Sequence, residues 1–571
     1  MPGNILKRGS IVENKVSTGN WWEKLGKPQY GGELVIRANR NILSFDPYIT
    51  ENLANLYSAW LERLVADDWT LDPAVFDYKT HWHPSRYMKG NMAESWEFTD
   101  PTTHVIHLRK GIHWQDIPPA CGREFIADDV VFHYNRLCGL GGGYTKTASP
   151  PAPGLHDLVS VTATDKYTVV FKFKTPNTEL IMEAIHKVYP SLCLENPDAV
   201  KKWGDLNDWH HAIGTGPFIL QQFISGNSAT LVKNSNYWAH DERYPQNQLP
   251  YIDTVKYLII PDDETALEAM RTGKIDVLDV VKPWQAQAMR KSNPEILQIP
   301  HPNSDALTIE PRNDVKPFND IRVRKAMQMA IDLPAIARDY YHNTVEPFPV
   351  MLTSRYMKGW GFPYEEWPQD LKDEYAYNPA VARQLLADAG YPHGFKTNIV
   401  TDAVKNLDLL QIVKSYFAAV GIDMEIRTMD RLAFVDFVMN GKKHDQLVHC
   451  PPGPLGHTAS PFLELTRFRN GSGNWAMVDD PVFNSLLPKA MATTSYDDMK
   501  QLIREANERV ARQHFTISLL QPMYYSLCQP WVKGFNAQHG SSWGHTGGPG
   551  MLSFYLGRFW IDRDLKKSMA H

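Results

Sequence analysis

The chain of 571 residues is 43% hydrophobic and 22% charged, which is the balance of a folded protein and excludes a largely disordered one. Its 59 basic and 64 acidic residues give a net charge of −5, which excludes the positive potential typical of nucleic-acid-binding proteins. No apolar stretch approaches the about 18 residues that a transmembrane helix requires. The length predicts several hydrophobic cores arranged in lobes.

The N-terminal segment, residues 1–30, combines scattered glycine, proline and charge without periodicity, so we predict an arm that precedes the fold. It lacks the apolar core of a signal peptide and a lipid-anchor cysteine, so we expect any export signal to have been removed or never to have existed. The fold is predicted to begin at the apolar run Leu34–Ile36, a buried strand that ends in the polar turn of Asn39, Arg40 and Asn41.

Three hairpins are predicted in the following 200 or so residues. The segment 93–112 alternates about a turn at Asp100–Thr103, and the segment 159–174 repeats the pattern. The third hairpin starts from the glycine-rich GTGPF turn, has its tip at Gly226 and ends with the aromatic pair Tyr237–Trp238. We therefore expect a strand-rich region with interspersed helices.

Further along the chain the apolar period becomes helical. A helix that ends at Gly273 is predicted to lead into the buried strand 275–281. Asp320 is expected to cap a helix around 321–331, and Asn378 with Pro379 opens a helix that ends at Gly390. A third helix ends at Gly421 and precedes an alternating strand, so this part of the chain is predicted to be an α/β lobe.

Five blocks, in this order along the chain, resemble segments of the extracellular solute-binding proteins (family 5) of ABC importers. They are AESWEFTDPTTHVIHLRKGIHW (93–114), REFIADDVVFHYNRL (123–137), GTGPFILQQFISGNSATLVKNSNYW (214–238), PFNDIRVRKAMQMAID (317–332) and YNPAVARQLLADAGYP (377–392). Each block alone is a common hairpin or capped helix. Their number and order make the chain similar to this family over about residues 31–560.

The resemblance implies an α/β fold of the type II periplasmic-binding-protein kind, in which two lobes, one enlarged by an extra subdomain, surround a central ligand cleft. The expected division, after the arm of residues 1–30, is a first lobe of 31–55, 210–300 and 510–571, an extra subdomain of 56–209 and a second lobe of 301–509. In such a fold a solute that touches both lobes favours the closed form by its higher affinity for that form.

The same resemblance implies a receptor that captures a solute by lobe closure and delivers it, chemically unchanged, to the membrane subunits of an ABC importer. We accordingly expect no catalytic residue, no metal and no cofactor. We expect a monomer in the periplasm or outside the cell, associated with the membrane through the importer. Two alternatives stay open: a hydrolase or metal-dependent enzyme with a dispersed site, and a receptor that presents its solute to a sensor. The 21 histidines and five cysteines show no spacing typical of a metal site.

Candidate ligand-binding residues lie in loops that adjoin the matched blocks, where the resemblance implies a face of the cleft. Polar side chains and flat aromatic rings suit such a site because they combine directed hydrogen bonds with apolar contact. The candidates are Asn39, Arg40, Asn41, Trp284, His457, Asn474 and Trp475.

Peptide-binding members of the family usually present an aspartate to the α-ammonium group of the ligand, from a loop that follows a strand of the second lobe. The corresponding stretch here, residues 444–462, has no acidic residue between Asp445 and Glu464. An ammonium group buried without a carboxylate partner pays a desolvation cost, so this departure counts against ordinary peptides unless another acid substitutes. His449 and His457 lie in the same stretch. The solute class stays open between peptides, oligosaccharides and metal chelates.

Overall fold

The computed structural model describes residues 20–48, 54–57, 59–68, 70–76, 84–145, 155, 157–176, 178–186, 193–302, 308–349, 357, 359–402, 407–450, 461–462, 473–493, 495–534 and 556–569. Its contacts divide the chain into two units: unit 1 comprises Met1–His301 and Tyr524–His571, and unit 2 comprises Pro302–Met523. The chain therefore leaves unit 1 once and returns to it once. Within the described ranges, no helix is both long and apolar enough to cross a membrane.

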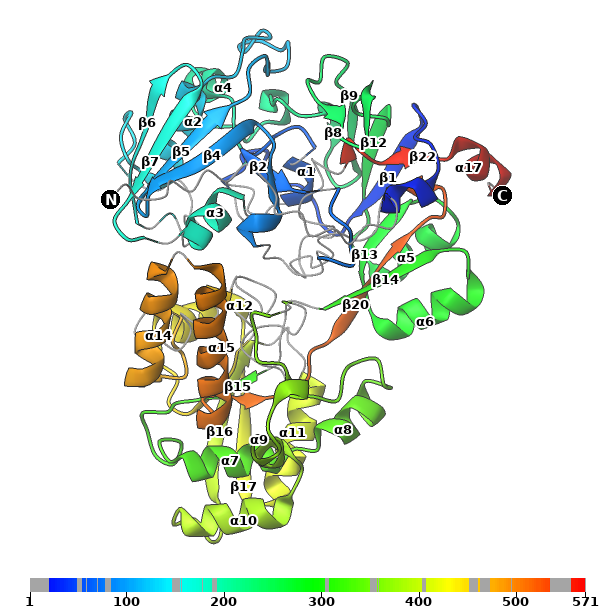
Figure 1. Ribbon diagram of the computed structural model, residues 1–571. Helices are drawn as coiled ribbons and strands as arrows, with labels where there is room; N and C mark the ends of the chain where they lie inside the picture. The colour runs from blue at the N-terminus through cyan, green and yellow to red at the C-terminus, as the bar shows by residue number, and fades with distance from the viewer. Residues whose placement is uncertain are drawn as a thin grey trace. The chain divides into compact units, whose positions relative to one another are not determined.

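The sheet of unit 1 collects strands from distant parts of the chain. In the described residues its order is β14 (Leu297–Pro302), β20 (Met523–Cys528), β13 (Val277–Val281), β1 (Glu33–Ala38), β12 (Thr254–Ile259), β9 (Ser228–Lys233) and β8 (Phe218–Ile224). Strand β1 is parallel to β12 and β13, while β9 is antiparallel to both β12 and β8 (Figure 1). Leu34 and Ile36 of β1 face the core that contains Trp60, and Val35 faces helices α5 (Asp263–Arg271) and α6 (Pro283–Ser292).

A second sheet in unit 1 consists of the two earlier hairpins. Its four antiparallel strands, in the described part of the chain, are β4 (Ala93–Asp100), β5 (Thr103–Leu108), β7 (Thr168–Phe173) and β6 (Leu158–Asp165). Helix α2 (Ala127–Cys138) packs against this sheet through a shared hydrophobic core. This confirms the hairpin turns predicted from the sequence.

The remaining elements of unit 1 are short. They include the ladders β2 (Val65–Asp67) with β3 (Met88–Gly90), β10 (His240–Asp241) with β11 (Tyr244–Gln248), and β21 (Val532–Lys533) with β22 (Trp560–Ile561). The helices are η1 (Trp21–Leu25), α1 (Ala54–Tyr57), η2 (Ser85–Tyr87), α3 (Thr178–His186), α4 (Pro197–Trp203), η5 (Trp209–His211) and α17 (Arg563–Met569).

Unit 2 has its own five-stranded sheet among the described residues. The order is β17 (Ile422–Met429), β16 (Phe395–Asp402), β18 (Leu447–Cys450), β15 (Thr308–Pro311) and β19 (Ile517–Ser518). Strands β17 and β18 are both parallel to β16. Unit 2 extends to Met523 and includes β19, which pairs with β15. The lobe and subdomain boundaries expected from the sequence stay predictions.

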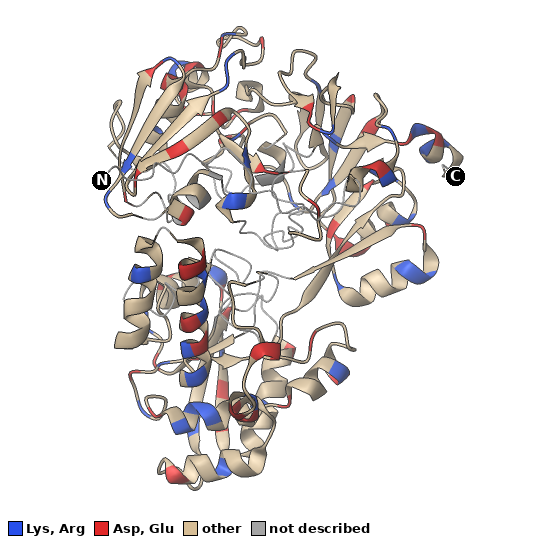
Figure 2. Cartoon of the chain, viewed as in Figure 1, with Lys and Arg blue, Asp and Glu red and all other residues tan. Residues whose placement is uncertain are grey.

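The helices of unit 2 cover both faces of its sheet and confirm the predicted caps. The Asp320 carboxylate accepts a hydrogen bond from the Arg322 N–H at 2.9 Å, and the Asn378 side chain accepts one from the Val381 N–H at 3.1 Å. The helices are α7 (Ile321–Met329), α8 (Leu333–Ala335), η6 (Ile336–Tyr340), η7 (Tyr364–Glu366), α9 (Gln369–Tyr375), α10 (Pro379–Asp388), α11 (Leu407–Ala419), α12 (Arg431–Phe434), η8 (Val435–Asn440), α14 (Pro481–Ala492) and α15 (Tyr496–Gln513). Acidic and basic residues are interspersed along the elements of each unit (Figure 2).

The GTGPF turn passes against the backbone of Trp60. The Gly216 N–H donates to the Trp60 carbonyl at 2.9 Å, and the Gly214 carbonyl accepts from the Gln115 N–H, also at 2.9 Å. A Cβ atom at position 214 would lie 1.7 Å from the Trp60 carbonyl oxygen, a distance far shorter than any non-bonded contact allows. This turn therefore requires glycine because two backbones touch, and it connects the hairpin β8–β9 to the rest of unit 1.

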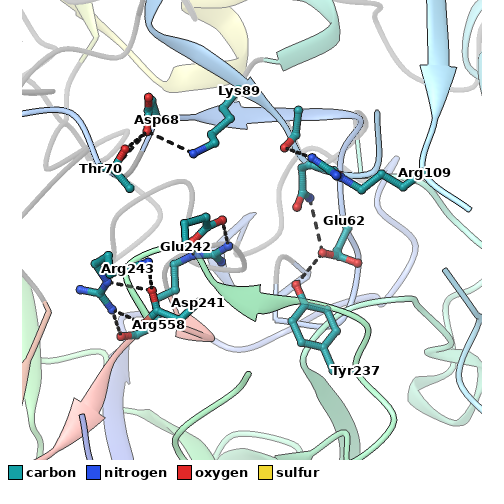
Figure 3. A network of polar contacts seen from close by, with 12 residues as sticks. Glu62, Asp68, Thr70, Lys89, Arg109, Tyr237, Asp241, Glu242, Arg243 and Arg558 are labelled. Carbon is teal, nitrogen blue, oxygen red and sulfur yellow. Dashed lines mark hydrogen bonds and ion pairs between the residues drawn. The ribbon is translucent and has the colours of Figure 1, made fainter. Parts of the chain in front are cut away.

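The aromatic pair that ends the hairpin belongs to a polar network around Glu62. The Tyr237 hydroxyl donates to the Glu62 carboxylate at 2.8 Å (Figure 3). The Trp238 Nε1–H donates to the same carboxylate at 3.0 Å. Burial raises the pKa of Glu62, although the hydrogen bonds from Trp238 and Tyr237 oppose that shift. Tyr237 and Trp238 therefore stabilise unit 1 by their hydrogen bonds to Glu62.

Candidate ligand-binding edges

Each unit has an edge at which the parallel strands of its sheet end. In open α/β sheets, ligands bind outside the carboxyl ends of the strands. In unit 1 these are the ends of β1, β12 and β13, and in unit 2 the ends of β16, β17 and β18. Asn39, Arg40 and Asn41 directly follow β1, and Trp284 follows β13, so the fold brings these four predicted residues to one edge.

One residue of the polar turn after β1, Asn41, uses its side chain in hydrogen bonds within unit 1. The Asn41 Oδ1 accepts from the Gly226 N–H at 2.9 Å, and its Nδ2–H donates to the Ser225 hydroxyl at 3.0 Å, which fastens the tip of the β8–β9 hairpin. The Asn39 Oδ1 atom is buried and has no hydrogen-bond partner within the described ranges. Arg40 is half-buried between them. The Asn39 side chain therefore has spare hydrogen-bonding capacity in this turn.

Trp284 is an exposed aromatic side chain at the start of α6. It is 60% exposed, and the Lys282 Nζ lies 5.5 Å from the centroid of its ring, in cation–π range. Leu432, Leu43 and Trp284, exposed by 82%, 72% and 60%, are the most exposed large hydrophobic side chains that the structure describes. All three follow the carboxyl end of a parallel strand: β17, β1 and β13 respectively. The three most exposed of these side chains therefore lie beyond strand ends where ligand binding is expected.

The edge of unit 2 also carries an ion pair that the sequence analysis missed. Asp402, the last residue of β16, is fully buried, and its Oδ2 atom lies 3.2 Å from Nη1 of Arg431. Asp430 caps α12 through two backbone N–H groups at 3.0 Å. An acidic residue at the end of a predicted strand is the sequence signal for Asp402, because its burial depends on distant residues.

Asn474 and Trp475 are integrated into unit 2. Trp475 is 5% exposed, packs in a cluster with Val400 and Val448, and donates its Nε1–H to the Met439 carbonyl at 3.3 Å. Asn474 exchanges two hydrogen bonds with the backbone of Val478, at 2.7 and 3.0 Å. A contact between either residue and a solute stays a prediction. The predicted residue His457 lies outside the described residues.

The two described histidines of this region, His444 and His449, lie inside the fold. His449 is fully buried in β18, with its Nδ1 atom 3.1 Å from the Thr401 hydroxyl. Burial lowers the pKa of His444, whose Nε2–H donates to the Trp475 carbonyl at 2.8 Å. Across the residues that the structure describes, no group of three or more His, Cys, Asp or Glu side chains is placed to hold a metal ion.

Two α/β units joined by two passages of the chain, each with a sheet edge at which parallel strands end, are typical of the periplasmic-binding-protein class. The model of the family described as "bacterial extracellular solute-binding proteins, family 5 Middle" matches residues 88–458, and the chain belongs to this family. This confirms the family and the fold class predicted from the sequence. Family 5 proteins are transport receptors, so the protein is a solute-binding receptor of an ABC importer on the periplasmic side and not an enzyme.

Comparisons with individual proteins agree with the family. The chain is 24% identical to heme-binding protein A of Haemophilus influenzae over 471 residues, which cover 78% of this chain and 81% of that protein. It is 25% identical to the dipeptide-binding protein of Escherichia coli over 469 residues, covering 78% and 83%. The solved periplasmic binding protein DppA of Helicobacter pylori, in complex with the peptide STSA, shares the fold with a TM-score of 0.69 at 21% identity, covering 95% of this chain and 99% of that one.

Proposed function

We propose that the solute is a short peptide with apolar side chains, bound by exposed apolar residues that follow the carboxyl ends of parallel strands. The observation that carries this proposal is the position of Leu43, Trp284 and Leu432, which are exposed and apolar just beyond parallel strands. Covering exposed apolar side chains with a ligand is favourable by about 25 cal/mol for each Å² of apolar surface removed from water. The dipeptide-binding relative and the peptide-bound neighbour support the same class.

Heme is a second candidate because two observations favour it. The relative named heme-binding protein A matches over most of its length. The stretch between Asp445 and Glu464 has no acidic residue to pair with the ammonium group of a peptide. A large flat ligand would also suit an exposed indole such as Trp284. The oligosaccharide alternative gains no support from these relatives.

We further propose that the receptor acts as a monomer and associates with the membrane through its importer. Native mass spectrometry of the purified protein gives its oligomeric state and the mass of any solute that co-purifies. A dimer as the main species would refute the first part of this proposal.

A ligand panel tests the solute class directly. We expect the dipeptide Leu-Leu to raise the unfolding temperature more than Ser-Thr-Ser-Ala, reduced glutathione or hemin does. A ligand present at 100 times its Kd stabilises the folded state by about 2.7 kcal/mol, which a thermal shift detects easily. If hemin alone raised the unfolding temperature, heme would replace a peptide as the proposed solute. No shift with any of the four compounds would contradict both candidates.

Replacing Trp284 tests its place in the site. We expect Trp284→Ala to weaken the binding of Leu-Leu about tenfold, measured by calorimetry, because a buried aromatic contact is lost from the complex. Leu297→Ala is the matched control, since Leu297 is an exposed apolar residue of the same unit, 46% exposed, at the amino end of β14. Equal effects of the two substitutions, or none from Trp284→Ala, would remove Trp284 from the site.

A further inference from the structure

Strand β13 contains a bulge just before Trp284. It pairs with β20 through Leu278 and Leu527, but the next pair is Val281 with Tyr525, so β13 accommodates one extra residue. The extra residue, Val280, has a φ of +62°, a left-handed conformation that is a genuine outlier for a β-branched side chain. Such strain persists only where the surroundings hold it in place.

The Asp279 carboxylate holds this bulge. Its Oδ1 atom accepts hydrogen bonds from the Ser526 hydroxyl at 2.5 Å and from the Val280 N–H at 3.0 Å. The Nε2 atom of His301 lies 3.2 Å from the same oxygen. The side chains of Asp279, His301 and Ser526 are all buried. Three donors therefore converge on one oxygen beside the strained residue.

The partners of Asp279 come from the two strands that lead out of unit 1 and back into it. His301, in β14, is the last residue of unit 1 before the chain leaves it, and Ser526 lies in β20, just after the chain returns. The arrangement is not that of a hydrolytic triad, because the Ser526 hydroxyl donates to the carboxylate and not to the histidine. Its burial also leaves no access for a substrate.

The segment from the bulge to Trp284 has little freedom. Val281 is buried in the core beside α6, the Lys282 N–H donates to the Gln285 Oε1 at 3.1 Å, and Pro283 has a φ fixed by its ring. The conformation of Val280 is thus transmitted directly to the first turn of α6. A change in the bulge would move the indole of Trp284.

We propose that Asp279 is a positioning residue for solute binding: by holding the Val280 bulge to β14 and β20, it sets the orientation in which Trp284 meets the solute. This inference rests on the proposed role of Trp284. It assigns a task to a buried carboxylate that would otherwise only add a charge to the interior of the sheet.

A double-mutant cycle with the dipeptide Leu-Leu tests the proposal. We expect Asp279→Ala to weaken binding about tenfold in the native background and to have no further effect in Trp284→Ala, because the two residues act through one contact. Asp279→Asn keeps an oxygen that can accept from Ser526 and Val280, so it should restore most of the affinity. Independent, additive losses in the cycle would overturn the proposal.

Asp276→Ala is the matched control. Asp276 is also buried, precedes the same strand, and accepts hydrogen bonds from the Val35 N–H at 2.7 Å and the Trp531 Nε1–H at 2.6 Å. It lies at the opposite end of β13 from Trp284, so its loss should lower stability without a change in affinity. An equal loss of affinity in Asp276→Ala would mean that the effect of Asp279 is only structural.

Hydrogen exchange of the ligand-free protein provides a readout that needs no solute. We expect Asp279→Ala, and more weakly Ser526→Ala, to speed the exchange of the backbone amides of residues 280–286, while Asp276→Ala leaves them unchanged. Exchange that is unaltered in Asp279→Ala overturns the proposal even if Leu-Leu binds. If native protein fails to bind Leu-Leu but the exchange responds as expected, the peptide proposal fails and the positioning of Trp284 by Asp279 stands.

Discussion

Arg558→Ala is expected to lower the free energy of unfolding by about 2–3 kcal/mol, because it removes a buried guanidinium and leaves Glu242, whose side chain is 24% exposed, without its partner. The Arg558 side chain is 2% exposed, and its Nε–H donates to the Glu242 Oε2 at 2.8 Å (Figure 3). Burial alone would raise the pKa of Glu242, but the charge of Arg558 and its hydrogen bonds lower it. Urea denaturation followed by circular dichroism measures the loss.

An exposed ion pair provides the control for this experiment. Arg338 and Asp339 are 61% and 64% exposed, so Arg338→Ala should change stability by less than about 0.5 kcal/mol. A similar small effect of Arg558→Ala would show that solvent enters the network and compensates Glu242. Solvent would then also be expected to reach the neighbouring pair of Arg243 and Asp241, since Arg243 donates a hydrogen bond to the Arg558 carbonyl at 3.1 Å.

Gly214→Ala is expected to destabilise the protein by about 3 kcal/mol or more, because the new methyl group would collide with the backbone of Trp60. The nearest atom, the Trp60 carbonyl oxygen, would be 1.7 Å from the Cβ atom, and a backbone atom cannot move aside as a flexible side chain can. Relief would require the GTGPF turn to shift and to give up its hydrogen bonds with Gln115. The same denaturation experiment measures the effect.

Gly226→Ala is the control that separates the cost of a steric clash from the cost of a left-handed backbone conformation. Gly226, at the hairpin tip, has a φ of +71°, and a Cβ atom added there would meet no described atom within 4 Å. Alanine there should cost about 1 kcal/mol, from the left-handed conformation alone. If Gly214→Ala costs no more than Gly226→Ala, the contact between the turn and Trp60 is looser than the structure indicates.

Local patterns were sufficient to predict most elements of the fold. The hairpin turn at Asp100–Thr103 and the caps at Asp320 and Asn378 are decided by residues a few positions apart, and the structure confirms them. The end of unit 2 was not predictable in the same way. It depends on the pairing of the two-residue strand β19 with β15, about two hundred positions earlier in the chain, and a two-residue strand has no measurable period.

The candidate site shows the same division between local and distant causes. Trp284 and the turn at Asn39–Asn41 could be proposed because they follow recognisable strands. The burial of Trp475 and the role of Asp279 depend on partners that lie far away in sequence. A tryptophan in a glycine-relieved loop has the same sequence whether it faces a solute or a core, so only the folded structure separates these cases.

Ribosomal synthesis makes β13 and β14 well before β20, the strand that separates them in the sheet of unit 1. Until β20 is made, β13 keeps an open edge and β14 has no neighbour in that sheet, whereas the described strands of unit 2 are all complete by Ser518. Open strand edges are sites of aggregation. A nascent or truncated chain that stops between Ser518 and Met523 therefore has all the described strands of the second unit, attached to a first unit whose sheet still has an open edge.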